Sequence, residues 1–256
     1  MLSHIQPIVL AAGKGTRMNS DLPKVLVEIG GQPMLNYLLN SLAKTEFSPP
    51  IVVVGYEKAK VMAILPPECL PVDQGEPKGT GHALQVGMTK VPPESDTVLL
   101  LYGDMPFWQS ATMERLAAHH AAEEATITLA IVDDNSDATA QFGRIVRGVS
   151  GQVEKIVEIK HASPAELALT ERNAALYIID KQFAEAELPN LQPHEATPGG
   201  GQGSGEYYAT DLIEAAITQG RKVITETVPV FEATGINTPE QLAAAKRVLQ
   251  EQTLSV

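Results

Sequence analysis

The stretch VLAAGKGTRMNSDLPKVL, residues 9–26, runs from an apolar segment through a turn of small residues into a region that carries cations. The apolar start predicts a buried strand, and the glycines behind it let a ligand approach the backbone closely, because glycine has no Cβ. Gly13 and Gly15 can adopt positive φ at little cost, which lets successive N–H groups face one anion. The stretch therefore predicts a strand that ends in an anion-binding turn.

Two cations follow this turn at positions that suit a phosphate ligand. Arg17 offers a planar fork of hydrogen-bond donors, and Lys24 offers a compact charge behind the rigid Pro23. Such a pair suits a triphosphate whose leaving group gains negative charge. The spacing matches neither the Walker loop nor the GxGxxG fingerprint, which argues against an ATPase and a dehydrogenase. In the alternative interpretation, both residues are solvated surface cations beside a tight turn.

The overall composition limits the partners of this site. The chain has 256 residues, of which 44% are hydrophobic, and its 31 acidic against 19 basic residues give a net charge of −12. This charge argues against nucleic acid or an anionic membrane as a partner, so a phosphate ligand must be bound by local groups. The single cysteine, Cys69, excludes an intrachain disulfide and suits the cytoplasm. The sequence shows neither a signal peptide nor an apolar run long enough to span a membrane, so we expect a cytoplasmic protein.

Alternating strand and helix patterns predict an α/β fold with a mixed, mostly parallel sheet covered on both faces. Short β-branched runs occur at 7–12, 51–56, 96–104 and 125–134, and amphipathic helical segments occur at 33–44 and 110–125. Residues 143–160 alternate apolar and polar positions around a turn, which predicts a small antiparallel β insertion. A helix at 209–220, a strand at 222–230 and a final helix at about 238–252 complete a single domain, 1–256, and we expect the glycine-rich segment 197–208 to form a mobile surface loop.

The end of the third strand carries a candidate metal ligand. Tyr102, Gly103 and Asp104 follow a buried apolar run, and in an open α/β sheet ligands bind at this end of the strands. Mg²⁺ prefers oxygen ligands and commonly takes one or two protein groups together with substrate phosphates, which makes Asp104 a candidate. The alternative role for Asp104 is that of a turn residue or helix N-cap.

Two more segments offer polar groups with open roles. Gln74 carries an amide that both donates and accepts toward a nucleotide base, which would lie over the small turn at 79–81. In the alternative, this turn is an ordinary helix start with Thr80 as its cap. Asn237, before a Thr-Pro helix start, is either an N-cap or a neutral oxygen ligand of a metal.

Seven motifs in a fixed order support a family resemblance that extends from about residue 8 to about residue 245. They are LAAGKGTRM (10–18), LPKVL (22–26), GTGHA (79–83), LYGDMP (101–106), FGRI (142–145), VEIK (157–160) and GEYYATD (205–211). In this order they resemble the uridylyltransferase domain of the bifunctional N-acetylglucosamine-1-phosphate uridyltransferase and glucosamine-1-phosphate acetyltransferase family, within the sugar-phosphate nucleotidyltransferase superfamily.

The resemblance implies a Rossmann-like fold, a Mg²⁺ requirement, and transfer of a uridylyl group from UTP to N-acetylglucosamine 1-phosphate, giving UDP-N-acetylglucosamine and pyrophosphate. It implies a nucleotide-binding part at about 1–110 and a sugar-binding part at about 111–240. The implied nucleotide-binding residues are Leu10, Ala11, Ala12, Gly13, Gly15, Lys24, Gln74, Gly79 and Thr80. The implied sugar-binding residues are Tyr102, Gly103, Gly143, Glu158 and Asn173. Arg17, Lys24 and Asp104 match the catalytic positions, and Asp104 and Asn237 match the metal ligands.

The chain departs from the family pattern in two respects. After Asn173 the family usually has Thr-Gly, whereas this chain has Ala174-Ala175, which leaves open a different sugar 1-phosphate of the glucose or N-acetylgalactosamine type. The hexapeptide repeats of the family's left-handed β-helix are not found in the chain, so we expect no acetyltransferase activity from it. A nucleotide-sugar binding protein without catalysis is the remaining alternative.

Overall fold

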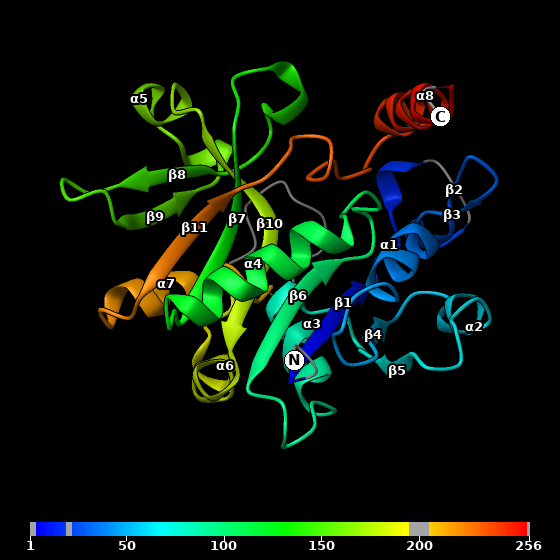
Figure 1. Cartoon of the computed structure of the whole chain (residues 1–256), viewed down its shortest axis with the longest axis horizontal. Coiled ribbons are helices and arrows are strands. Elements are labelled where there is room, and N and C mark those ends of the chain that lie inside the picture. The colour runs from blue at the N-terminus through cyan, green and yellow to red at the C-terminus, as the bar shows by residue number, and fades with distance from the viewer. Residues whose placement is uncertain (1–3, 19–21, 195–204, 255–256) are drawn as a thin grey trace.

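The computed structural model describes residues 4–18, 22–194 and 205–254, so most of the glycine-rich segment 197–208 lies outside the described residues. Within the described part, nine strands form one sheet with the spatial order β11-β7-β10-β6-β1-β4-β5, and β8 and β9 extend it beside β10 (Figure 1). The strands are β1 (Ile5–Ala11), β4 (Ile51–Val54), β5 (Leu70–Asp73), β6 (Thr97–Tyr102), β7 (Ile127–Asp133), β8 (Arg144–Arg147), β9 (Val153–Val157), β10 (Glu171–Asp180) and β11 (Val223–Thr227). Two short strands, β2 (Glu28–Ile29) and β3 (Gln32–Pro33), pair separately.

Helices cover both faces of this sheet because its central strands are apolar on both sides. Along β1, Val9 and Ala11 pack on one face while Ile8 and Leu10 pack on the other. The first face is covered by α1 (Met34–Leu42), α2 (Lys58–Met62) and α4 (Ser110–Ala122), and the second by α3 (Gly79–Met88), α6 (Lys181–Glu187) and α7 (Asp211–Thr218). The remaining helices are α5 (Pro164–Leu167) and α8 (Pro239–Leu254). None of the helices in the described ranges has the length and apolar character needed to span a membrane.

The expected mixed, mostly parallel sheet is confirmed. Its antiparallel central strand, β10, was not predicted from the sequence. β1 pairs in parallel with β4 and β6, and β7 with β11, whereas β10 lies antiparallel between β6 and β7. The expected antiparallel insertion is confirmed as the β8–β9 hairpin, which joins β10 through Arg144 and Arg172. β10 escaped prediction because its sequence, ERNAALYIID, begins with three polar residues and is neither a continuous apolar run nor a strict alternation.

β10 is bent in the middle. Its pairing with β7 shifts register between Asn173 and Tyr177, and Ala175 within this bulge has φ +53°. The left-handed region costs an L-residue roughly 1–2 kcal/mol, a cost that glycine avoids. The resemblance described above implies a glycine at this position, which fits such a bulge, whereas alanine holds it under strain.

We expect substitutions of Ala175 to report this strain. Ala175→Val should lower the free energy of unfolding by about 1–2 kcal/mol, because a β-branched side chain is poorly tolerated at positive φ. Ala175→Gly should remain within about 1 kcal/mol of the original chain, since relief of strain offsets the lost methyl contacts and the added chain entropy. Urea unfolding of the three proteins measures both differences, and a valine variant as stable as the original would contradict the strained geometry.

Candidate active site

The candidate site lies where β1 and β6 end side by side. The two strands run in parallel, so the turn after Ala11 and the turn after Tyr102 meet at one edge of the sheet. The Gly103 N–H donates to the Leu10 carbonyl at 2.9 Å, which ties these turns together. A Cβ on Gly103 would lie 3.0 Å from the Val25 side chain, so a larger residue is unfavourable there. The strand ends therefore place Asp104 beside the opening glycine turn.

Four polar side chains from distant parts of the chain converge at this edge. The Lys24 Nζ forms an ion pair with the Asp104 carboxylate and donates to the Asn237 Oδ1 at 2.6 Å. The Arg17 Nη2 donates to the same Asn237 oxygen at 3.0 Å. The Lys24 side chain is only 12% exposed, so it is not the solvated surface cation of the alternative interpretation. Arg17 is exposed but shares the same partner.

The alternative capping roles of Asp104 and Asn237 do not match the structure. Asp104 lies in the turn after β6, whereas Gln109 holds the N-cap position of α4. Before α8, the Thr238 Oγ1 accepts from the Gln241 N–H at 3.3 Å, while the Asn237 side chain faces Arg17 and Lys24. Both side chains thus point away from their own backbone turns, and both contact Lys24.

The opening turn contributes to this cluster through Gly15. Gly15 has φ +69°, and a Cβ on it would lie 2.5 Å from the Lys24 Cβ, so glycine is needed for the close approach of the two segments. Gly13 differs from the expectation, because it is absent from the residues with positive φ. A Cβ on Gly13 would meet nothing within 4 Å, and its outer side is open to a ligand.

Gln74 and the 79–81 turn form a second part of the site. The Gln74 Nε2 donates to the Gly79 carbonyl at 3.1 Å, and the Gln74 backbone N–H donates to the Val54 carbonyl at 2.7 Å. Gly79 has φ +92°, and a Cβ there would clash with the Tyr207 carbonyl oxygen. Tyr207 pairs with this turn, since its N–H donates to the Lys78 carbonyl at 2.9 Å and its own carbonyl accepts from the Gly81 N–H at 2.8 Å.

Thr80 does not cap α3 as the alternative interpretation has it. Lys78 is the N-cap residue, and the Thr80 Oγ1 accepts from the Ala209 N–H at 3.0 Å. The threonine therefore ties the start of α3 to the GEYYATD segment, and its side chain also lines the adjoining cavity.

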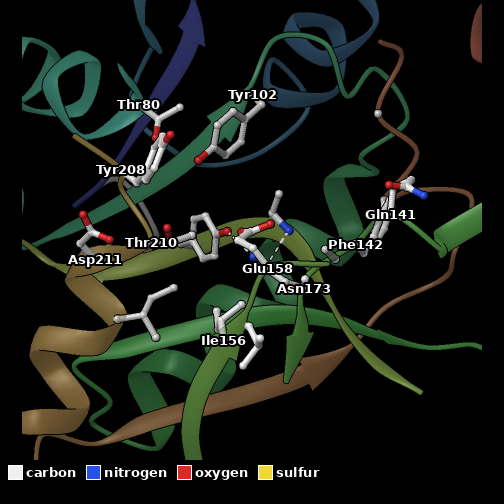
Figure 2. A pocket seen from close by; sticks show the side chains of 18 of the residues that line it. Thr80, Tyr102, Gln141, Phe142, Ile156, Glu158, Asn173, Tyr208, Thr210 and Asp211 are labelled. Atoms are coloured by element: carbon white, nitrogen blue, oxygen red, sulfur yellow. Dashed lines mark hydrogen bonds between the residues drawn. The ribbon is translucent and has the colours of Figure 1, made fainter. Parts of the chain in front are cut away.

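A cavity of about 690 Å³ opens next to the cluster, and Figure 2 shows Tyr102, Glu158 and Asn173 facing it. Of the expected sugar-binding residues, all but Gly103 line this cavity. Ala174 and Ala175 also lie on its wall, as do Asp104 and Asn237 from the cluster. The cavity therefore joins the cationic cluster to the expected sugar-binding residues.

Several lining residues had no assigned role in the sequence analysis. Tyr208, Thr210 and Asp211 project from the segment GEYYATD, and Gln141 and Phe142 lie across the cavity from them (Figure 2). Ile156 on β9 also lines the cavity. The motif GEYYATD contains the first three of these residues and could have indicated that they lie at the site. Phe142 precedes the FGRI glycine, but nothing in the pattern indicated which way its side chain points.

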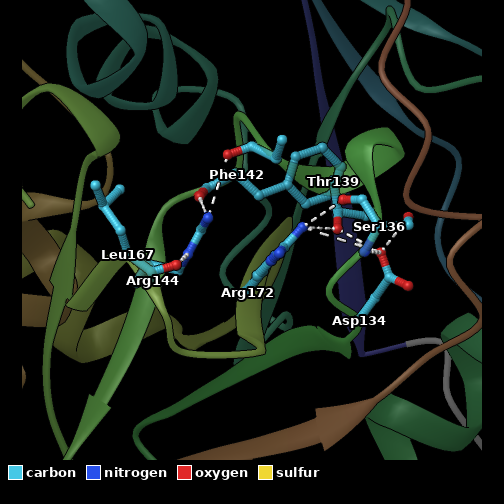
Figure 3. Close-up of polar contacts among 8 residues, drawn as sticks. Asp134, Ser136, Thr139, Phe142, Arg144, Leu167 and Arg172 are labelled. Atoms are coloured by element: carbon cyan, nitrogen blue, oxygen red, sulfur yellow. Dashed lines mark hydrogen bonds and ion pairs between the residues drawn. The ribbon is translucent and has the colours of Figure 1, made fainter. Parts of the chain in front are cut away.

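The wall that carries Phe142 and Gly143 is shaped by a buried arginine. Arg144 donates to the backbone carbonyls of Phe142, Ala140 and Leu167, the last at 3.3 Å, as Figure 3 shows for Phe142 and Leu167. Burial, and then the charge of Arg172, lowers the pKa of Arg144 below its ordinary value. A guanidinium that satisfies several carbonyls at once fixes the path of the 140–143 loop.

A second buried arginine holds the beginning of the same loop. The Arg172 Nη1 donates to the Ser136 carbonyl at 2.9 Å and to the Thr139 hydroxyl (Figure 3). The Asp134 carboxylate accepts from the hydroxyls of Ser136 and Thr139, both at 2.6 Å, and these bonds hold the pKa of Asp134 below its ordinary value. The loop is therefore anchored to β8 and β10 at both ends before it reaches the cavity.

The tyrosines of the cavity provide neutral hydrogen-bonding groups. Burial raises the pKa of Tyr102 and of Tyr177 well above the ordinary value, so both hydroxyls stay protonated at neutral pH. The two rings meet edge to face with centroids 6.5 Å apart. Such hydroxyls suit an uncharged polar ligand such as a sugar ring.

Comparison with known proteins places this chain in a family. The chain matches the MobA-like NTP transferase domain over residues 7–185. It is 38% identical over 249 residues to a bifunctional protein GlmU of an Exiguobacterium species, covering 96% of this chain and 53% of that protein. It is 36% identical over 247 residues to the corresponding protein of Chromobacterium violaceum, covering 95% of this chain and 51% of that protein. The chain thus spans about half the length of the curated relatives that it matches.

Solved structures show the same fold at much lower identity. A UDP-glucose pyrophosphorylase in complex with UDP-glucose aligns with TM-score 0.75 and 15% identity, covering 96% of this chain and 98% of that one. A 4-diphosphocytidyl-2C-methyl-D-erythritol synthase from Anaerococcus prevotii aligns with TM-score 0.65 and 17% identity, covering 96% of each chain. Because the family match spans most of the sheet and both strand ends of the site, the chain belongs to the family of MobA-like NTP transferase domains.

Proposed function

We propose that this protein transfers a uridylyl group from UTP to N-acetylglucosamine 1-phosphate, giving UDP-N-acetylglucosamine and pyrophosphate. The observation that carries the proposal is the convergence of Arg17, Lys24, Asp104 and Asn237 beside a cavity that Asp104 and Asn237 also line. The identity to bifunctional GlmU proteins along nearly the whole chain supports it.

The nucleotide would lie along the ends of β1 and β5. The backbone from Leu10 to Gly13 and the positive-φ turn at Gly15 would face the phosphates, and the open side of Gly13 leaves room for them. The base would lie over the 79–81 turn, where the Gln74 amide is already fixed by the Gly79 carbonyl. This assigns the nucleotide to about residues 1–110 and the sugar mainly to about 111–240, which supplies most of the cavity wall.

The reaction requires no protein nucleophile. A phosphate oxygen of the sugar phosphate attacks the α-phosphorus of UTP in line, a new O–P bond forms, and the bond to the pyrophosphate oxygen breaks. Lys24 would stabilise the α-phosphate or the incoming sugar phosphate, and the exposed Arg17 would stabilise the departing pyrophosphate. Both cations are held by Asn237 before any substrate binds, so little reorganisation is needed.

The cluster fits a hard divalent cation such as Mg²⁺. The Asp104 carboxylate and the Asn237 amide oxygen both contact the Lys24 ammonium group, and this closeness of two oxygen ligands supports a shared cation. Within the described ranges there is no group of three or more His, Cys, Asp and Glu side chains arranged for a metal. A metal at this place would therefore take its other ligands from phosphates and water, as Mg²⁺ commonly does. Mg²⁺ would supply neutralisation of the phosphate charge.

The first experiment measures Mg²⁺-dependent pyrophosphate release from UTP with each of three acceptors: N-acetylglucosamine 1-phosphate, N-acetylgalactosamine 1-phosphate and glucose 1-phosphate. We expect a clear preference for the first acceptor. Preference for another acceptor would change the assigned sugar phosphate but keep the proposed reaction type. This outcome is worth testing because Ala174 and Ala175 lie on the cavity wall. Tight binding of a UDP-sugar without pyrophosphate release would indicate the binding protein instead.

Removing either member of the Lys24–Asp104 pair should impair turnover without unfolding the chain. Lys24→Ala and Asp104→Ala should each lower kcat by roughly 10²–10³, the usual effect of losing one transition-state charge partner. Lys222→Ala is the matched control, because Lys222 forms a 2.8 Å ion pair with Glu123 away from the cavity. Near-normal kcat in both site variants would refute the assignment.

Gln74 should govern the choice of nucleotide. Gln74→Ala should reduce the preference for UTP over CTP and ATP by about tenfold, because a buried base edge would lose its partner. Gln74→Glu keeps the length of the side chain but removes its donor group, so it separates base contact from simple filling of space. Competition among the three nucleotides for one sugar phosphate measures the ratio. An unchanged ratio in both variants would exclude Gln74 from the base site.

A further inference from the structure

The bulge in β10 brings together two side chains that a regular strand would keep apart. Residues four positions apart in an extended strand are separated by about 13 Å along the backbone. The register shift between Asn173 and Tyr177, with Ala175 at φ +53°, bends the strand within this interval. As a result the Asn173 Nδ2 donates to the Tyr177 hydroxyl oxygen at 2.7 Å.

Both ends of the Asn173 amide are fixed by this geometry. Its Oδ1 accepts from the Ala175 N–H at 3.1 Å, while its Nδ2 donates to Tyr177. A side-chain amide has two N–H groups and two lone pairs, so one donor and one acceptor site are left over. Asn173 is 9% exposed and lines the cavity, so these two sites are the ones available to a ligand there.

Tyr177 is rigidly held. Its side chain is 2% exposed, and its ring packs in the apolar cluster between the sheet and α6 and α7. The edge-to-face contact with Tyr102 fixes the ring from the cavity side. A hydroxyl mounted on such a ring has little freedom, so it defines the orientation of the amide that donates to it.

We propose that Tyr177 is a positioning residue for the sugar phosphate, whose hydroxyl orients the Asn173 amide toward the sugar ring. The inference rests on the proposed function and specifies which chemistry the pocket selects. The oriented amide presents one donor beside one acceptor, and this pair matches a sugar hydroxyl or an acetamido group. The amide carries no charge that would bind a phosphate, so loss of its orientation should weaken binding of the sugar and not of the phosphates.

Tyr177→Phe tests this role, because it keeps the ring and its contacts and removes only the hydroxyl. We expect the KM for the sugar phosphate to rise about tenfold, as a buried amide loses its partner and its fixed orientation. The kcat and the KM for UTP should stay within about twofold of the original values. Tyr37→Phe is the matched control, since it removes a hydroxyl that donates to the Ile29 carbonyl at 2.6 Å, outside the cavity.

A double-mutant cycle distinguishes action through Asn173 from direct contact. In an Asn173→Ala background, Tyr177→Phe should produce no further rise in the KM for the sugar phosphate, because its only route of action is gone. An equal rise in both backgrounds would overturn the proposal, as would a Tyr177→Phe variant with an unchanged KM.

Titration calorimetry separates failure of this inference from failure of the proposed function. Tyr177→Phe should weaken binding of UDP-N-acetylglucosamine about tenfold and leave binding of UTP unchanged. If the original chain binds the UDP-sugar but releases no pyrophosphate, the function fails while this result still supports the positioning role. Equal weakening for both ligands, or no binding of the UDP-sugar by the original chain, would overturn the positioning role.

Discussion

The contact on which the site depends is the ammonium group of Lys24, which lies between the Asp104 carboxylate and the Asn237 amide. These three residues come from the opening loop, the end of a central strand and the approach to the last helix, so one cation joins the beginning, middle and end of the chain. Gly15 permits the approach, because any Cβ at that position would contact the Lys24 side chain. Under the proposed function, the ammonium group would bind a phosphate, and the two oxygen atoms would bind the metal that accompanies it.

The cavity wall that carries Phe142 and Gly143 is held differently, because buried arginines donate hydrogen bonds to its backbone carbonyl oxygens. Arg144 and Arg172 are both nearly inaccessible, yet most of their bonds go to carbonyls and hydroxyls of one loop. Desolvating two guanidinium groups is unfavourable, and the bonds recover that cost only when the loop takes a single conformation. The part of the cavity wall that carries Phe142 and Gly143 is therefore specified by polar interactions from behind the loop.

The sequence was sufficient to predict the strand ends and the cations, because apolar runs and small-residue turns are local signals. It predicted β1, β6 and the hairpin, and it named the four residues that the structure gathers at one edge. It did not predict β10, because the polar residues at its start, Glu171, Arg172 and Asn173, interrupt the apolar run that marked the other buried strands. Nor could it show that Gln74 bonds the Gly79 carbonyl or that Tyr177 reaches Asn173, since both depend on backbone bends rather than on residue spacing.

The pairing of Tyr207 with the 78–81 turn has a consequence for how such a protein can acquire a new substrate. The turn beneath the proposed base position and the segment that carries Tyr208 into the sugar cavity share the same backbone hydrogen bonds. A substitution that moves one of them moves the other. Under the proposed function, a change in the base-binding turn would therefore also shift the segment that lines the sugar side of the cavity, so the preferences for base and sugar would change together.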